Sequence, residues 1–303
     1  MTKLLFVEAL SPLHAGTGQS TGAVDLPIAR ERATDFPYLP GSSLKGALRD
    51  RARDVGGFPV AAMFGPETAN ASDHAGSLAF GDANLLLLPV RSVKGTFAYV
   101  TSPLLLTRLA RDAQTAKLEG LASAAREAAA KVPATTDKCV VTAVTLLKLM
   151  LAEGKKVVFE DFDLVEDPQG TAAADKLAES LGVALFPMQG DEAMRTQLTG
   201  RLCLVHDDLM TYFARHGTDV VTRVSINEGT KTAKDGSLWT EENLPVATVL
   251  VSQVEGLHVD ATKVRPQDLL AKLDTLVAKP LQLGGKASVG RGRCRLQMAG
   301  GDK

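Results

Sequence analysis

Two side chains near the start of the sequence have the types needed for acid-base chemistry. His14 and Asp25 lie in or beside a segment rich in glycine, serine and threonine, residues 12–22, and Arg30 follows closely. Imidazole and carboxylate groups are common proton carriers in enzymes, and a guanidinium group binds phosphate. Loop aspartates more often serve turns and caps, so the sequence alone leaves Asp25 a candidate catalytic residue and His14 a weaker one.

The segment near the C-terminus combines glycine with positive charge. It contains Gly284, Gly285, Gly290, Gly292, Arg291, Arg293 and Arg295. Alternate residues of a strand share a face, so the three arginines are predicted to form one row suited to a phosphate chain. The glycines would let backbone N–H groups approach phosphates closely, as in an anion-binding nest. A glycine turn that only bends the strand is the alternative.

A basic ridge marks the helix predicted over residues 44–55, for which a preceding serine is the expected N-cap. Lys45, Arg49 and Arg53 are spaced four apart and therefore share a face beside an apolar stripe. Such a ridge is usually solvated, and a phosphate-binding role is the alternative. Asp82, within a strand pattern, is expected to make a structural hydrogen bond.

The glycine-rich segments do not match nucleotide-binding motifs. The glycine spacing in residues 16–22 is one residue too long for a dinucleotide fingerprint, and Pro27 breaks the helix that should follow. Residues 41–46 lack the Gly-Lys-Ser/Thr ending of a P-loop. We therefore expect no organic cofactor, and an enzyme that uses a dinucleotide is a disfavoured alternative.

Composition limits the kind of binding surface. With a formal net charge of -1 over 303 residues, any nucleic-acid-binding surface must be local. Few aromatic residues are present, so contact with a sugar-phosphate backbone is expected rather than base stacking. Cys139, Cys203 and Cys294 are far apart, which predicts buried thiols. No apolar run approaches the ~20 residues of a membrane span, so we expect a cytoplasmic protein with no membrane partner.

The elements that must position these residues form a strand-helix-strand unit at each end of the chain. The first unit is predicted as a strand over 4–9, the helix over 44–55 and strands over 78–90 and 97–103. The second is a strand over 246–254, a helix over 267–277 and a glycine-interrupted strand over 281–298. This is the order of a ferredoxin-like, or RNA-recognition-motif-like, sheet with a long insertion.

The intervening sequence is predicted to be mostly helical and to end in a hairpin. Helices are expected over 106–118, 121–132 and 175–185, with one or two more over 194–216 and strands over 157–165 and 220–226. The polar, glycine-containing stretch that follows predicts a protruding hairpin near residues 227–240.

The order of these motifs resembles, over nearly the whole chain, the target-RNA-cleaving backbone subunits of type III-B CRISPR (Cmr) effector complexes, which are RAMP-superfamily proteins. The resemblance is carried by residues 12–22, 24–31, 36–49, 221–227, 234–242 and the C-terminal glycine loop. Each motif is weak alone, and their joint order is specific.

The resemblance implies an α+β fold with a hand-like shape. It implies a single RAMP domain over residues 1–303, with a modified ferredoxin-like (RRM-like) palm over about 1–105 and 245–303. A large helical insertion and a thumb β-hairpin would occupy about 106–244, and a glycine-rich loop would lie near the C-terminus.

The family's essential aspartate corresponds by motif to Asp25, with His14 as a loop organiser and, less favoured, an acid. The chemistry implied is attack of a target ribose 2′-hydroxyl on the adjacent phosphate, giving a cyclic phosphate, with a divalent metal (Mg²⁺ or Mn²⁺) whose ligands the sequence does not identify. The RNA contacts expected are Lys45, Arg49, Arg53, Lys286, Arg291, Arg293, Gly284 and Gly285. The thumb residues expected are Asn227, Lys231, Lys234 and Trp239.

The partners implied are the guide RNA (crRNA), target RNA, further copies of the chain in a filament, and other Cmr subunits. Two alternatives keep the superfamily but change the role. One is a structural subunit that spaces the guide without cutting. The other is a precursor-crRNA processing endonuclease that relies on a histidine and needs no metal.

Overall fold

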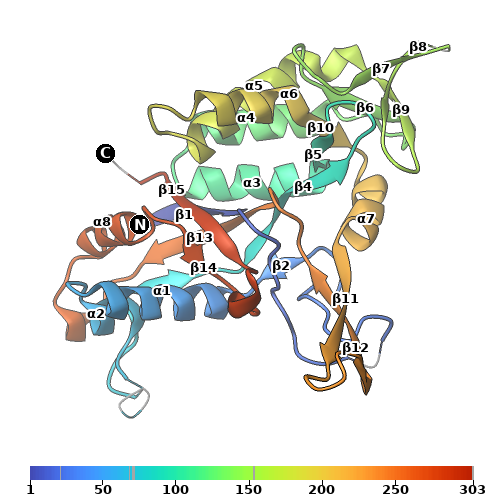
Figure 1. Ribbon diagram of the computed structural model, residues 1–303. Coiled ribbons are helices and arrows are strands. Elements are labelled where there is room, and N and C mark those ends of the chain that lie inside the picture. Colours follow the sequence, from blue (N-terminus) through green and yellow to red (C-terminus); the bar gives the residue numbers. More distant parts are fainter. Residues whose placement is uncertain (21, 68, 70–71, 153, 302–303) are drawn as a thin grey trace.

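The computed structural model describes residues 1–20, 22–67, 69, 72–152 and 154–301 (Figure 1). Thr21, within the first motif of the resemblance, and residues 302–303 of the expected palm lie outside the described residues. No helix in the described part is both long and apolar enough to cross a membrane.

The palm sheet is built from the two ends of the chain. Its elements are β1 (Thr2–Ala9), β2 (Tyr38–Leu39), α1 (Gly41–Val55), α2 (Val60–Phe64), β3 (Leu78–Phe80), β4 (Ala83–Arg91), β13 (Val249–Gly256), α8 (Pro266–Leu276), β14 (Leu281–Gln282) and β15 (Arg293–Ala299). Strands β15, β1, β13 and β4 lie side by side in that order, and each neighbouring pair is antiparallel. This is the ferredoxin-like arrangement predicted from the sequence.

The insertion extends the same sheet beyond β4. Its elements are β5 (Phe97–Thr101), α3 (Pro103–Thr115), α4 (Glu119–Ala130), β6 (Lys138–Val141), β7 (Lys148–Leu151), β8 (Gly154–Val158), β9 (Asp163–Glu166), α5 (Thr171–Leu185), α6 (Glu192–Arg201), β10 (Leu202–Val205) and α7 (Asp207–His216). The sheet continues from β4 through β5, β10, β6, β9 and β8 to β7. The insertion therefore combines helices with strands rather than being mainly helical.

Strand β1 contributes to two hydrophobic cores, one on each face of the sheet, because its alternate side chains point in opposite directions. Leu5 and Val7 join a core that includes Leu48 of α1, whereas Leu4 and Phe6 join the core under α3, α4 and α5. In Figure 1, α1 and α8 lie on one side of the palm sheet and α3 on the other. Helices on both sides of the palm sheet therefore pack against β1.

Three predicted strands are interrupted. Residues 78–90 form β3 and β4, which both pair with β13 and are separated at Gly81 and Asp82. Residues 157–165 form the end of β8 and the start of β9, an antiparallel pair. Residues 281–298 form β14 and β15, separated by a short 3-10 helix. Polar and glycine residues at the breaks release the chain from the ladder.

Helix α1 begins at Gly41, before the serines, and no side chain of its N-cap residue, Pro40, accepts a hydrogen bond. Instead, Asp82 Oδ1 accepts a hydrogen bond from the backbone N–H of Gly41 at 2.8 Å. A Cβ atom on Gly41 would lie 2.4 Å from the carbonyl oxygen of Phe80, so close packing requires glycine there. The structural role predicted for Asp82 is confirmed, and the serine cap was wrong.

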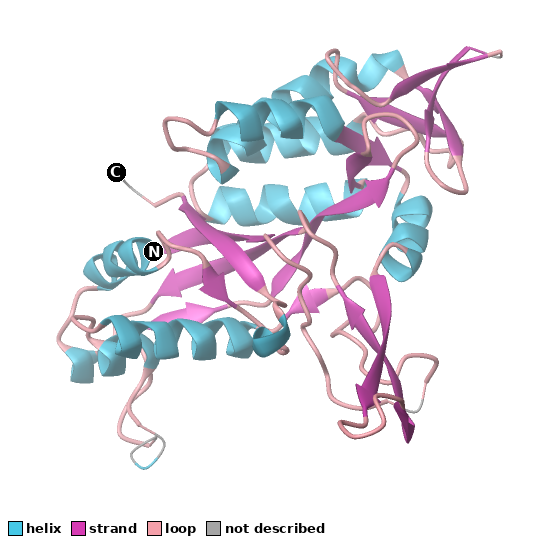
Figure 2. Cartoon of the chain, in the orientation of Figure 1, coloured by secondary structure: helices cyan, strands magenta, loops and turns pink. Residues whose placement is uncertain are grey.

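The predicted hairpin is present, with strands β11 (Asp219–Ile226) and β12 (Ala233–Asn243) joined by residues 227–232. The register places Thr222 opposite Thr240. Figure 2 shows these two long strands extending away from the palm sheet. The base of the hairpin follows α7, so the insertion and the hairpin leave the palm through the same connection, between β4 and β13.

Candidate active site

The loop that carries Asp25 pairs with the hairpin as a short extra strand. Leu26 bridges Glu241 in parallel, with its N–H donating to the Thr240 carbonyl at 3.1 Å. The Glu242 N–H donates in turn to the Leu26 carbonyl at 3.0 Å. Leu13 and Leu244 exchange two backbone hydrogen bonds of 2.9 Å. The loop is therefore held along the hairpin and at its base.

Asp25 is exposed, and Thr240 holds its carboxylate. Asp25 Oδ2 accepts hydrogen bonds from the Thr240 N–H at 2.7 Å and from the Thr240 hydroxyl at 2.8 Å. These bonds, the backbone one first, lower the pKa of Asp25 below its usual value because they stabilise the charged form. The site therefore presents an ionised carboxylate near neutral pH.

His14 is buried and joins three segments. Its Nδ1 lies 2.7 Å from the Glu242 carbonyl oxygen, and its own carbonyl accepts a hydrogen bond from the Gly285 N–H at 2.9 Å. Only 6% of its surface is exposed, and a Cβ atom on Gly16 would lie 2.4 Å from its Nε2. This geometry suits a residue that organises the loop.

A cavity of about 500 Å³ lies beside Asp25. It is lined by Gln19, Ser20, Asp25, Leu26, Gly236, Leu238, Trp239 and Lys286. The structure thus brings together three predicted residues from distant segments: Asp25 from the first loop, Trp239 from the hairpin and Lys286 from the glycine-rich loop. His14 is not among the described residues that line this cavity. A carboxylate, an ammonium group and an aromatic ring can together bind a nucleotide.

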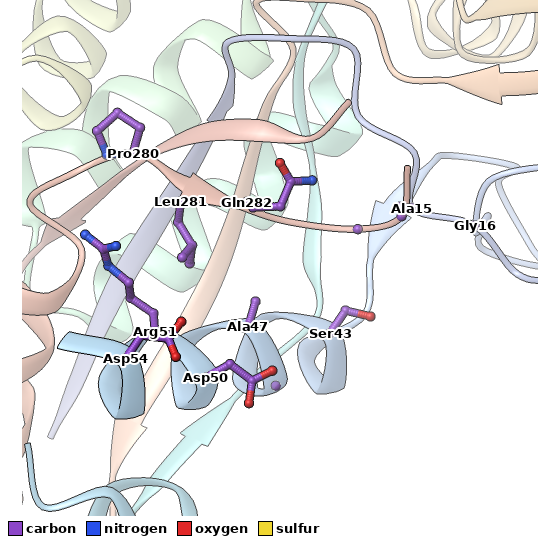
Figure 3. A pocket seen from close by; sticks show the side chains of 13 residues that line it. Ala15, Gly16, Ser43, Ala47, Asp50, Arg51, Asp54, Pro280, Leu281 and Gln282 are labelled. Atoms are coloured by element: carbon purple, nitrogen blue, oxygen red, sulfur yellow. The ribbon is translucent and has the colours of Figure 1, made fainter. Parts of the chain in front are cut away.

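A larger cavity, of about 790 Å³, lies between α1 and the glycine-rich loop. Figure 3 shows Ser43, Ala47 and Arg51 on α1 and, across the cavity, Leu281 and Gln282. Small residues are frequent in its lining, among them Ala15, Gly16, Gly46, Gly284 and Gly285. Because these side chains take little space, a polymer backbone can approach the protein backbone closely there.

The predicted basic ridge does not line this cavity. Arg53 binds both carboxylate oxygens of Glu67, at 2.6 and 2.7 Å, and Arg49 donates to the Pro66 carbonyl at 2.6 Å. Arg51, which the sequence reasoning missed, is the arginine of α1 that lines it. Its position three residues after Leu48 and seven after Leu44 places this arginine beside the apolar stripe of the helix, which a helical projection of the sequence would have shown.

The three C-terminal arginines do not form one row. Arg291 precedes β15 and is separated from it by Gly292, whose φ of 75° breaks the strand alternation. Its Nε lies 3.4 Å from Oε1 of the buried Glu241. Arg295 pairs with Asp191 at 2.7 Å, whereas Arg293 is exposed. The prediction that all three arginines share one strand face was therefore wrong.

The glycine loop uses backbone amides within the chain. The N–H of Gly292 donates to the Pro12 carbonyl at 2.8 Å, and that of Gly290 to the Ala287 carbonyl at 3.0 Å. A Cβ atom on Gly284, whose φ is 68°, would lie 2.4 Å from the His14 carbonyl oxygen. The Gly285 N–H likewise donates to the His14 carbonyl. Most of the amides predicted to bind an anion are therefore already hydrogen-bonded within the chain. Gly284 and Gly285 allow the loop to pack closely on His14.

Glu242 is the buried group that joins the first loop to the hairpin. Its carboxylate binds Arg30 at 2.5 Å, the Ile28 N–H at 3.1 Å and the Thr218 hydroxyl at 2.8 Å. Its side chain is only 7% exposed, so each of these bonds acts in a medium of low dielectric constant. Glu242 ends a segment that carries the family resemblance, but its pairing with Arg30 was not predicted from the sequence.

No group of three or more His, Cys, Asp or Glu side chains that could hold a metal ion is found among the described residues. Asp25 offers a single carboxylate. Mg²⁺ commonly binds proteins through one or two carboxylates and completes its shell with water and substrate phosphates. The side chain therefore fits a metal ion that arrives with RNA, and does not form a closed protein site.

The fold and the site define a ferredoxin-like protein with a thumb hairpin. Comparison with known proteins identifies its family. Residues 6–295 match the model of the RAMP superfamily. The CRISPR system Cmr endoribonuclease Cmr4 of Pyrococcus furiosus is 35% identical over 295 residues, covering 95% of this chain and 92% of that protein. The CRISPR system CMR subunit Cmr4 of Saccharolobus solfataricus is 24% identical and covers 97% and 96%.

Solved structures of related proteins have the same fold. A crystal structure of oligomeric Cmr4 from Pyrococcus furiosus superposes with a TM-score of 0.71 at 26% identity, covering 100% of this chain and 99% of that one. A cryo-EM structure of the type III-B Cmr-beta complex bound to cognate target RNA contains a chain of the same fold, with a TM-score of 0.76, 20% identity, and coverage of 98% and 97%. The chain therefore belongs to the RAMP superfamily and, within it, to the Cmr4 family.

Replacing Glu242 by alanine tests whether its carboxylate fixes the hairpin. Loss of one partner of a buried ion pair is expected to destabilise the loop-hairpin unit by on the order of 3 kcal/mol, because Arg30 is left unpaired. Amide hydrogen exchange in residues 219–243 should then be faster. Glu228→Ala, at the exposed hairpin tip, is the matched control and should leave exchange at the hairpin base unchanged. Equal exchange in both variants would contradict the assignment.

Proposed function

We propose that this chain is the guide-RNA-binding backbone subunit of a type III-B complex and cuts guide-paired target RNA at regular intervals. The observation that supports it most is Asp25, exposed and ionised beside a cavity formed by the hairpin and the glycine-rich loop. The relative from Pyrococcus furiosus carries the name endoribonuclease, and the Cmr-beta complex was solved with target RNA.

The target would lie in the cavity beside Asp25. The hairpin would separate one target nucleotide from the duplex, so that its ribose 2′-hydroxyl can attack the adjacent phosphorus in line. The 2′-hydroxyl loses its proton to solvent as its oxygen bonds to phosphorus. The bond from phosphorus to the 5′ oxygen breaks and that oxygen takes up a proton from solvent, leaving a 2′,3′-cyclic phosphate and a 5′-hydroxyl on the other product. Lys286, which lines the same cavity, would neutralise charge on that phosphate.

Asp25 is better suited to orient the 2′-hydroxyl than to remove its proton alone. A carboxylate whose pKa is lowered is a weak base, and general bases work best with a pKa near the pH of the reaction. It would accept a hydrogen bond from the 2′-hydroxyl and, with RNA phosphates, hold a Mg²⁺ or Mn²⁺ ion. When bound, such an ion would stabilise negative charge on the phosphate.

The guide RNA would run through the larger cavity between α1 and the glycine-rich loop. Gly284, Gly285 and Arg51 line it, as do the carboxylates of Asp50 and Asp54, so guide contact there would depend on close backbone approach and on Arg51 rather than on a net positive surface. Lys45, Arg49, Arg53, Arg291 and Arg293 remain proposed contacts. Of these, Arg53 and Arg291 already lie beside carboxylates of the chain, so their contribution should be small.

Assembly with other chains is part of the proposal. Asn227, Lys231 and Lys234 are exposed and lie in or next to the turn of the hairpin, before the cavity residue Trp239 in β12. In a filament this end would meet RNA held by a neighbouring copy, and other Cmr subunits would close the ends. The crystal structure of oligomeric Cmr4 supports self-association of this fold.

Replacing Asp25 by alanine or asparagine in a reconstituted complex with guide RNA tests the cleavage role. Cutting of labelled complementary target in Mg²⁺ should fall by about 100-fold or more, because the 2′-hydroxyl loses its orienting group, while target binding persists. His14→Ala should act mainly through the stability of the loop. If Asp25→Asn cuts as fast as the wild type, the catalytic role of Asp25 is wrong and another residue must carry the cleavage.

Arg51 and Arg53 provide a matched pair for the guide-binding groove. They lie two residues apart on one helix, but Arg51 lines the cavity and Arg53 is clamped by Glu67. Arg51→Ala should weaken guide RNA binding and reduce the salt dependence of log K by about one phosphate contact. Arg53→Ala should have a much smaller effect on both. Filter binding at several salt concentrations measures both, and equal effects would remove the groove from the proposal.

A further inference from the structure

Thr240 makes a reciprocal contact with Asp25, in which the threonine hydroxyl is both a hydrogen-bond donor and an acceptor. The hydroxyl donates its proton to Asp25 Oδ2 at 2.8 Å and accepts the Asp25 N–H at 2.9 Å. The Thr240 N–H donates to the same carboxylate oxygen at 2.7 Å. A side chain that both donates and accepts at this distance from the backbone must be a threonine or a serine.

All the bonds from Thr240 to the carboxylate go to one oxygen. Oδ2 is thereby occupied, and the rotation of the Asp25 carboxylate is restricted. No other described residue donates a hydrogen bond to Oδ1, so we infer that this oxygen faces substrate. An exposed aspartate on a long loop would otherwise populate several rotamers. The bond to the Asp25 N–H also fixes the backbone from which that side chain extends.

We propose that Thr240 is a positioning residue for Asp25, which orients the carboxylate and makes its placement depend on the hairpin. This proposal rests on the proposed cleavage role of Asp25 and deepens it. Thr240 lies in β12, the hairpin strand that also carries the cavity residues Leu238 and Trp239. Any displacement of this strand by RNA moves the carboxylate with it, so the group that opens the duplex also sets the geometry of the cut.

The contact has a matched control on the same hairpin. Thr222 lies opposite Thr240 in the strand register, is exposed, and belongs to the neighbouring strand β11. Thr240→Val keeps the shape and the β-branched character of the side chain but removes the hydroxyl. Thr240→Ser keeps the hydroxyl and removes the methyl group. Thr222→Val repeats the first change at a site that does not hold Asp25.

The test is single-turnover cleavage of labelled target by complexes reconstituted with each variant, alongside target binding. We expect Thr240→Val to cut about 10-fold more slowly or worse, with unchanged target affinity and unchanged cut positions. Thr240→Ser should cut within about 2-fold of the wild type because it retains the two-way hydrogen bond, and Thr222→Val should match the wild type. Thr240→Ala serves as a second hydroxyl-free variant if the valine variant does not assemble.

The outcomes separate this proposal from the one on which it rests. If Asp25→Asn is inactive but the hydroxyl-free variants cut normally, or if serine fails to rescue, Thr240 has no positioning role. If Asp25→Asn itself cuts like the wild type, the cleavage role of Asp25 fails first.

Discussion

The buried carboxylate of Glu242 is the contact on which the candidate site depends most. It lies at the base of the hairpin and binds Arg30 and the Ile28 N–H of the first loop. These bonds order the loop that carries Asp25 along β12. By itself such a loop would sample many conformations. That pairing also determines the position of Asp25, because Asp25 directly precedes the paired residue Leu26. The site is therefore a property of the loop and the hairpin together, and neither carries it alone.

The palm explains why these segments meet. In a ferredoxin-like sheet the first and third strands are central neighbours, so the loop after β1 and the chain before β13 lie at the same end of the sheet. The hairpin enters that end just before β13, and the glycine-rich loop reaches it just before β15. His14 ties the last two together through its backbone and ring. Segments more than 200 residues apart in the sequence thus surround one cavity.

Local pattern predicted the elements of the palm and the hairpin well, because periodicity and turn residues act over short ranges. It predicted Asp25 and Lys286 only through motif order, since nothing local distinguishes them. It could not predict tertiary partners: Arg53 pairs with Glu67 and Arg291 lies beside Glu241, and neither acid is near its arginine in sequence. Thr240 and Glu242 were missed for the same reason, because their roles exist only once the loop pairs with the strand.

The central claim is that the target's own 2′-hydroxyl, oriented in the cavity beside Asp25, makes each cut. Targets that carry a single 2′-deoxynucleotide, placed in turn along the guide-paired region, test it directly in the assembled wild-type complex. The account predicts that a deoxynucleotide on the 5′ side of one cut abolishes that cut and leaves the others at their positions. Cutting that continues at the deoxy position would contradict the account, because it would require a different nucleophile.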